Sequence, residues 1–234
     1  STATAKSETS GFTVSVPSLS QFTLSAFAAG AEAQTSLEIA QDAQLFSAFV
    51  LDDMATALQE YEENLFVNGT GSGQAQGLIG NVGAGVTEEP DSNGNMVSIS
   101  GTLDLIATLK DTYHANASWL MSRTTSIVIR KAQVQSNLFE PVFTRDANGQ
   151  DRLHGYPCYY SSAMPSAARS NAPVLFGDFK RGYIIGDRGG AAIRMKLLDQ
   201  AYAAQGLLGL LAYRRTDGRV RRSEAIQQYN VAAT

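Results

Sequence analysis

The stretch LQEYEENLFVNGTGSGQAQGLIG, residues 58–80, joins a helical pattern to a glycine-rich segment. Neither glycine nor proline interrupts residues 36–67, so this whole range is predicted to form one helix. Taken from Leu45 to Phe66, the helix is ~33 Å long at 1.5 Å per residue. Such a long apolar face needs an equally long partner, most simply a sheet that lies along it. The residues of this face recur at helical spacing: Phe46, Val50, Met54, Leu58, Tyr61 and Leu65, widened by Leu45 and Phe49.

The glycines that follow the helix are expected to terminate it and not to hold phosphate. Asn68-Gly69 is typical of a helix C-terminus, with Gly69 in the left-handed conformation. A phosphate cradle needs its glycines between a strand and a helix N-terminus, where free N–H groups meet the anion. The segment also lacks Gly-Lys-Ser/Thr, and Gln76 stands where the dinucleotide fingerprint has glycine.

Other segments predict strands mixed with one more helix. Residues 11–35 alternate at period two and are predicted as strand, broken at Pro17. Residues 102–116 are predicted as a helix, and residues 126–131, SIVIRK, as a short apolar strand. The helix would place Leu103, Ile106, Leu109 and Tyr113 on one face.

The rest of the chain reads as strands and turns. Within residues 142–160, Asn148-Gly149 predicts a hairpin turn. Residues 173–198 give two or three strands, and residues 205–229 a hydrophobic run with a second turn at Asp217-Gly218. The chain shows neither an internal repeat nor a dividing linker, so the predicted class is α+β, mixed throughout.

Composition narrows the function classes. The 234 residues are 44% hydrophobic, enough for one large domain or two interleaved lobes. A net charge of −4 and a pI of about 5.2 argue against a dedicated nucleic-acid binder. The single Cys158 excludes an intramolecular disulfide, favours a reducing compartment and is expected to be a small buried hydrophobe. Neither a membrane-spanning run nor a signal peptide is found, and the start at Ser1 indicates a processed chain.

Candidate catalytic groups are few. His114 and His154 lie on unrelated segments without acidic or thiol neighbours at ligand spacing, so a metal site is not expected. A Ser/His/Asp triad stays open, because its members meet only in space, although GxSxG is lacking. The acidic pairs Asp52-Asp53 and Glu62-Glu63 are interpreted as the solvated face of the long helix.

Five arginines gather near the C-terminus, at positions 214, 215, 219, 221 and 222. A hairpin through Asp217-Gly218 would distribute their side chains over two faces. Because the chain is acidic overall, contacts of Arg214, Arg215, Arg219, Arg221 and Arg222 with a neighbouring subunit or with solvent are favoured over contacts with DNA.

Four stretches, taken together and in order, resemble a known family. They are residues 58–80, LHGYPCYYSSAMP (153–165), VLFGDFKRGYIIGDRGG (174–190) and AYRRTDGRVRRSEAI (212–226). These resemble the spine helix with its glycine-rich loop, a Leu-x-Gly-Tyr-Pro strand, a Phe-Gly-Asp-Phe segment and the C-terminal Arg-x-Asp-Gly strand of Hong Kong 97-type major capsid proteins of tailed bacteriophages.

The resemblance implies a two-lobed fold. A peripheral domain would comprise residues 12–74 and 188–213, with the spine helix at 36–67 lying on a sheet from residues 12–30 and 190–213. An axial domain would comprise residues 75–187 and 214–234.

It also implies that residues 1–11 are the remnant of an extended E-loop in an N-terminally truncated chain. Some relatives cross-link an E-loop lysine to an asparagine. Lys6 is a candidate donor, but residues 197–209 offer Gln200 and Gln205 without asparagine, so this cross-link is not expected.

The implied function is structural. The subunit would self-assemble into pentamers and hexamers of an icosahedral head around double-stranded DNA, in the cytoplasm of a bacterial host. Portal and scaffold proteins would be partners, contact with DNA would be non-specific, and the inner wall would be near neutral or acidic. Catalytic, metal and cofactor residues and a membrane partner are not expected. Two alternatives remain: an encapsulin-like nanocompartment shell, and an α+β hydrolase.

Overall fold

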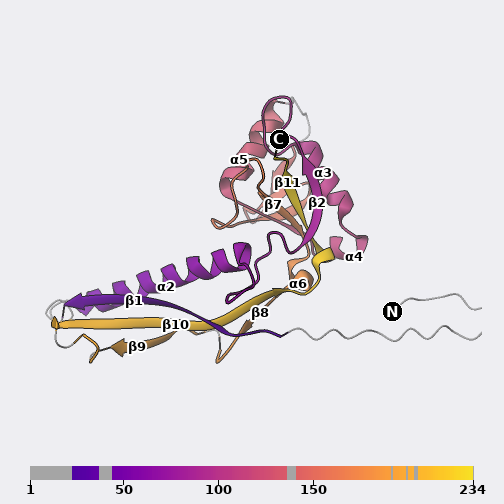
Figure 1. Cartoon of the computed structure of the whole chain (residues 1–234). Helices are drawn as coiled ribbons and strands as arrows, with labels where there is room; N and C mark the ends of the chain where they lie inside the picture. The colour runs from indigo at the N-terminus through magenta and orange to yellow at the C-terminus, as the bar shows by residue number, and fades with distance from the viewer. Residues whose placement is uncertain are drawn as a thin grey trace, which may run out of the picture.

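A computed structural model describes residues 23–36, 44–135, 141–190, 192–198, 200–202 and 205–233 of the chain. Figure 1 shows an elongated arm, in which a long helix lies along narrow strands, joined to a more compact part with a second sheet. Both α-helices and β-strands are present throughout, which confirms the mixed α+β class.

The arm contains a four-stranded antiparallel sheet. Its central strand, β10 (Leu207–Val220), pairs along one side with β1 (Phe27–Ser36). Along its other side it pairs with β9 (Arg194–Leu198) and then with β8 (Tyr183–Asp187). One long strand thus organises the whole arm.

The predicted long helix is α2 (Gln44–Asn68), whose 25 residues make it ~37 Å long at 1.5 Å per residue. It lies along β1 and β10 (Figure 1). Met54, Leu58 and Leu65 of the predicted stripe are buried, as expected. Phe49 and Tyr61, however, are exposed, so their assignment to the buried face is wrong. The predicted start at residue 36 is also wrong, because Ser36 ends β1; residues 37–43 lie outside the described part.

The helix ends at Asn68, as predicted, but Gly69 does not adopt the left-handed conformation that was expected to end it. The Gly69 amide continues the ladder by donating to the Leu65 carbonyl at 2.9 Å, and Gly69 does not have a positive φ. Left-handed backbone begins at Gly71, with φ of 77°. Glycine is required at position 69 because a Cβ would overlap the carbonyl oxygen of Ala75.

The compact part is built on a seven-stranded mixed sheet. Its strand order is β2-β11-β7-β3-β6-β5-β4. The bounds are β2 (Gly83–Glu88), β11 (Ile226–Val231), β7 (Val174–Gly177), β3 (Ser118–Met121), β6 (Tyr156–Tyr160), β5 (Asp151–Leu153) and β4 (Phe143–Arg145). The C-terminal strand β11 follows β10 after a short 3₁₀ turn, η2 (Ser223–Ala225), so the chain returns from the arm into this sheet.

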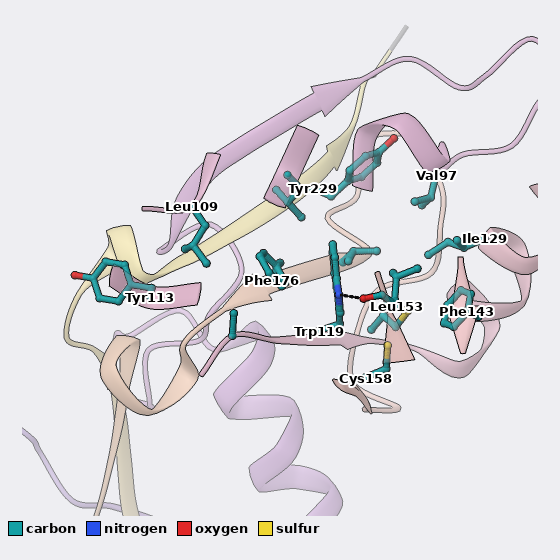
Figure 2. Close-up of a cluster of buried hydrophobic side chains, with 14 of the residues drawn as sticks. Val97, Leu109, Tyr113, Trp119, Ile129, Phe143, Leu153, Cys158, Phe176 and Tyr229 are labelled. Atoms are coloured by element: carbon teal, nitrogen blue, oxygen red, sulfur yellow. Dashed lines mark hydrogen bonds between the residues drawn. The ribbon is translucent and has the colours of Figure 1, made fainter. Parts of the chain in front are cut away.

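The core of this sheet surrounds Trp119, which is fully buried (Figure 2). Its ring centroid lies 4.3 Å from that of Phe176 on the neighbouring strand. The indole Nε1 donates a 3.0 Å hydrogen bond to the Leu153 carbonyl, which satisfies the ring's one polar atom. Cys158 is buried in the same cluster, as predicted.

Three helices pack against this core, and all three correct the sequence prediction. The expected helix at 102–116 is instead α3 (Ile99–Thr108) followed by α4 (Asp111–His114), because the backbone at Leu109 and Lys110 is extended. The Ser98 side chain caps α3 by accepting from the Gly101 amide at 2.8 Å. Leu109 and Tyr113 are buried as expected, whereas Leu103 is exposed.

The strand predicted at 126–131 is wrong, since these residues lie within α5 (Arg123–Gln135). A short apolar run does not distinguish a strand from a buried helix. The buried positions decide the matter, because their spacing of three and four is helical: Thr125, Ser126, Ile129 and Ala132.

Of the remaining turn and strand predictions, some are confirmed in full and one only in part. The Asn148-Gly149 turn is confirmed, with the Gly149 amide donating to the Asp146 carbonyl at 2.8 Å. Residues 173–198 do give three strands, β7, β8 and β9. Of the strand expected at 11–35, the part at 27–35 is confirmed and belongs to β1; residues 23–26 are not strand, and residues 11–22, with Pro17, lie outside the described part.

The turn predicted at Asp217-Gly218 is wrong, because both residues lie inside β10. Gly218 is a close-approach glycine in this strand, since a Cβ there would overlap the Tyr183 hydroxyl. The chain instead changes direction after Val220, where the Arg221 and Arg222 amides both donate to the Gly182 carbonyl.

Candidate functional site

Arg214 joins the long helix to the sheet of the arm. It projects from β10, and its Nη1 lies 3.0 Å from Glu62 Oε2 on α2. Its Nη2 lies 2.7 Å from Asp187 Oδ2 at the end of β8. One guanidinium thus ties together three elements that are distant in sequence.

Glu62 therefore corrects the expectation of a solvated acidic face. Its burial raises the pKa of the Glu62 carboxyl, although Arg214 acts in the opposite sense. Burial also acts to raise the pKa of Asp187, but the hydrogen bond and the charge of Arg214 act against it, and the pKa is lowered. Asp52 and Asp53 are exposed, as predicted, and Glu63 lies near the Ser162 hydroxyl, 3.4 Å away.

The glycine-rich loop after α2 braces the molecule internally. The Gln76 amide donates to the Gly218 carbonyl of β10 at 2.8 Å. The Tyr183 hydroxyl donates to the Gln76 carbonyl at 2.6 Å, and burial raises the pKa of this tyrosine. Beyond it, Leu78 packs with Leu175 and Ile226 of the second sheet. The loop therefore connects the arm to the compact part.

An apolar strip on the arm is left uncovered beside α2. Side chains alternate along a strand, and partners in register share a face. Met195 pairs with Ala212, Leu197 with Leu210, and Ile185 with Gly218.

Leu210, Ala212 and Gly218 are each an even number of residues from Arg214 along β10, so they lie on the same sheet face as Arg214. Their partners Leu197, Met195 and Ile185 therefore share the face on which Arg214 meets α2. The helix, however, lies over β1 and β10 (Figure 1) and meets β8 at Tyr183, whose ring centroid lies 6.2 Å from that of Phe66, while the three apolar side chains stay exposed. Exposed fractions are 50% for Ile185, 48% for Met195 and 53% for Leu197. We call these three residues the apolar strip.

The two histidines make contacts that hold them in place. Nδ1 of His114 lies 3.1 Å from the Tyr156 hydroxyl, and Nε2 lies 3.0 Å from the Leu109 carbonyl. His154 Nε2 lies 2.9 Å from the Thr102 hydroxyl oxygen, and burial lowers the pKa of this histidine.

Thr102 is a poor nucleophile for its histidine partner. Its hydroxyl donates to the Ile99 carbonyl at 2.6 Å, so its oxygen accepts from His154 and cannot give that base a proton. The residue is also fully buried. His154 lines an apolar cleft of about 520 Å³, but the arrangement does not form a triad with a serine and an acid among the described residues.

The other sequence candidates are placed as follows. Burial raises the pKa of the Cys158 thiol to about 12, which makes it unreactive. Within the part that the structure describes, a cluster of three or more metal-ligating side chains is not found. Nor does any described helix have the length and apolarity needed to cross a membrane.

The Arg214 cluster and the apolar strip were both missed at the sequence level. Glu62 falls four residues after Leu58 and three before Leu65, which places it inside the buried stripe of the helix and could have indicated its burial. The strip could not be found in this way, because it depends on how far the helix extends across the sheet.

A comparison with known protein families identifies the family of this chain. The phage capsid family matches residues 1–231. The chain belongs to the phage capsid family. A search of curated protein sequences found no significant match.

Solved structures share the capsid fold. The chain is similar to a structure titled "Capsid of empty GTA particle computed with C5 symmetry", with a TM-score of 0.74 and 22% identity over 96% of this chain and 81% of that one. It is similar to the Gordonia phage Cozz structure, with a TM-score of 0.61 and 14% identity over 97% and 80% of the two chains. It is also similar to the encapsulin of the holo-SrpI complex from Synechococcus elongatus, with a TM-score of 0.63 and 15% identity over 89% of this chain and 75% of that one.

The capsid family and this fold confirm the resemblance read from the four sequence stretches. The protein is a major capsid subunit of the Hong Kong 97-like fold, with a structural role in the icosahedral shell of a virion. The exposed surfaces of the arm are therefore the part of the molecule to examine for contacts between subunits.

Proposed function

We propose that this capsid protein assembles into pentamers and hexamers that close an icosahedral head around double-stranded DNA, and that it has no enzymatic activity. The observation that supports this most is the apolar strip. Three large apolar side chains, each about half exposed, lie on the sheet face that carries α2 and the Arg214 ion pairs. Such a strip is stabilised when a second subunit removes it from water.

The presence of two separate sheets supports a division of the chain into two domains. We propose that residues 12–74 and 188–213 act as a peripheral domain, and residues 75–187 and 214–234 as an axial domain that meets its neighbours around the five- and six-fold axes. The arm sheet crosses these boundaries, because β8 and residues 214–220 of β10 fall in the axial domain, so the two domains would move as one piece. Many modest contacts of this kind add up by avidity, and each can remain reversible during assembly.

We also propose where the shell assembles and which other molecules it contacts. Assembly would take place in the cytoplasm of a bacterial host with portal and scaffold proteins, and contact with the packaged DNA would be non-specific. The net charge of −4 supports an inner wall that holds DNA only weakly, because it offers few cations for counterion release.

A cargo-enclosing compartment is the second candidate, supported by the structural likeness to the encapsulin. Particles of the full-length protein, produced in bacteria and imaged by electron microscopy, test both functions. Uniform icosahedral particles are expected, and a protein that stays monomeric at assembly concentrations would contradict the proposal. Particles that consistently contain one co-purified protein would favour the cargo compartment instead.

A further inference from the structure

A small basic pocket opens at the point where the β8–β9 side of the arm sheet is interrupted. Strand β8 ends at Asp187 and β9 begins at Arg194, so the middle of β10 lacks a paired strand on that side. The pocket has a volume of about 160 Å³. We call it the arginine notch, and its charged wall consists of Arg188, Arg194, Arg214 and Arg215.

The notch is held in shape by the backbone around it. The Arg188 amide donates to the Arg215 carbonyl at 2.9 Å, and Arg194 Nη2 donates to the Gly189 carbonyl at 3.4 Å. Gly189 has a φ of 85°, and a Cβ there would overlap the Arg194 guanidinium. Glycine at this position therefore leaves room for the arginine.

The notch carries more positive charge than its surroundings neutralise. Arg214 is paired with Glu62 and Asp187. Among the described residues, an acidic partner is not found for Arg188, Arg194 or Arg215. Guanidinium groups remain charged at every working pH, so four arginines against the two carboxylates of Glu62 and Asp187 leave an excess of positive charge that favours an anion in the pocket.

The same chain presents unpaired carboxylates on the outer face of α2. Asp52, Asp53 and Glu60 are exposed, and an ion pair is not found for them within the described part of the chain. Phe49 and Tyr61 are exposed on this helix as well, which adds apolar area beside the acids. We call Asp52, Asp53 and Glu60 the acidic face.

We propose that the arginine notch receives carboxylates of the acidic face of a second copy of this chain. The proposal rests on the proposed self-assembly and names one of its contacts. Arginine binds carboxylates in bidentate geometry, and the notch accommodates one or two such groups. A pocket of this size suits isolated carboxylates better than the continuous phosphate backbone of DNA, which needs an extended row of cations.

A carbodiimide cross-link tests the contact directly. Arg215→Lys keeps the charge of the notch and supplies a primary amine that the reagent can join to a carboxylate within contact distance. Particles are assembled from a mixture of isotopically light and heavy Arg215→Lys subunits, treated with the reagent, digested and analysed by mass spectrometry. We expect mixed-isotope peptides that join the amine introduced at position 215 to Asp52, Asp53 or Glu60.

Charge reversal tests the same contact by function. Arg188→Glu with Arg215→Glu should raise the protein concentration needed for assembly by at least about tenfold, and so should Asp52→Arg with Asp53→Arg. The four changes together should restore assembly, because the charges are exchanged between the surfaces. Lys131→Glu, an exposed reversal on α5, is the control and should assemble normally.

The outcomes separate this contact from self-assembly itself. If wild-type protein forms no particles, the proposed function fails. If it forms particles but the amine at position 215 links to other carboxylates or to none, the notch proposal is wrong while self-assembly stands. It is equally wrong if notch reversal leaves assembly unchanged, or if it only releases bound nucleic acid. Circular dichroism of each variant separates a lost contact from a misfolded subunit, and the charge-conserving Arg215→Lys variant keeps the test valid if a reversed variant misfolds.

Discussion

Single residues decide how the long helix is fixed to the arm. Position 62 was expected to face water, because the acidic pair Glu62-Glu63 was assigned to the polar side of the long helix. The structure buries Glu62 because Arg214 reaches it from β10 and supplies the opposite charge. A buried carboxylate is tolerated only with such a partner, and sequence periodicity cannot identify a partner 152 residues away.

Removal of the guanidinium should therefore be costly. Arg214→Ala leaves Glu62 and Asp187 together without a cation, and we expect the free energy of unfolding of the subunit to fall by about 3 kcal/mol. Urea denaturation followed by circular dichroism measures this. The control is Arg169→Ala, since Arg169 and Glu89 form an exposed pair whose loss should cost less than about 1 kcal/mol. Equal losses for both variants would show that the Arg214 cluster does not fix the helix.

Cys158 offers a second test at this scale. With its pKa raised to about 12, the thiol is almost entirely protonated at pH 8, whereas an exposed cysteine is partly thiolate. Iodoacetamide should label the native subunit about a thousandfold more slowly than the unfolded subunit. Mass spectrometry with and without urea measures both rates. Rapid labelling of the native protein would contradict the burial of this side chain.

At the scale of elements, periodicity predicted the longest pieces best. The helix over residues 45–66 and its end at Asn68 were predictable, because many apolar positions repeat at one spacing and glycines follow. The six residues of SIVIRK were too few to decide between periods, and tertiary packing made them part of α5. Asp217-Gly218 has the composition of a turn, but Gly218 serves a close contact with Tyr183 instead.

The β4–β5 hairpin gives a prediction for acid pH. The pKa of Asp151 is lowered by the Tyr160 hydroxyl hydrogen bond and, against the effect of burial, by Arg145 and Arg130. A carboxylate whose folded pKa is below its unfolded value of ~3.9 stabilises the fold above that value, and this contribution is lost as the pH falls through the folded pKa. Asp151→Asn should therefore lower stability at pH 7 and have little effect near pH 2.

Urea denaturation of wild type and Asp151→Asn at several pH values between 7 and 2 tests this. The difference between the two unfolding free energies should shrink below about pH 4. Asp104→Asn is a matched control, because Asp104 is exposed on α3. A difference that stays constant across this range would mean that the asparagine disrupts packing and that the charge of Asp151 is unimportant.

The loop after α2 offers a test of its role as a brace. A Cβ at Gly77 would lie 2.6 Å from the Val67 carbonyl oxygen and would also overlap the Gly69 amide, so Gly77→Ala should destabilise the subunit by about 2 kcal/mol or more. Gly73→Ala meets open space and should cost only about 1 kcal/mol, the penalty for its positive φ of 69°. Thermal denaturation compares the two variants. A larger loss for Gly73→Ala would contradict the brace.

At the scale of the whole molecule, the fold and the family were within reach of the sequence, whereas the contact surfaces were not. Four short stretches in order were specific enough to indicate the capsid fold, which the family match confirms. The apolar strip and the arginine notch arise from where β8 ends, where β9 begins and how far α2 covers the sheet. These are relations between distant segments, and local sequence patterns do not contain them.

We propose that the uncovered side of the arm sheet is a surface for contact between subunits. Its most direct test is the assembly of Leu197→Asp, compared with wild type by sedimentation velocity and electron microscopy. Because Leu197 is half exposed in the subunit, this change should leave the thermal stability of the monomer nearly unaltered while it places an unpaired charge in the contact. We expect a folded subunit that no longer forms particles; particles of normal size and yield from Leu197→Asp would show that this side of the sheet is not an assembly surface.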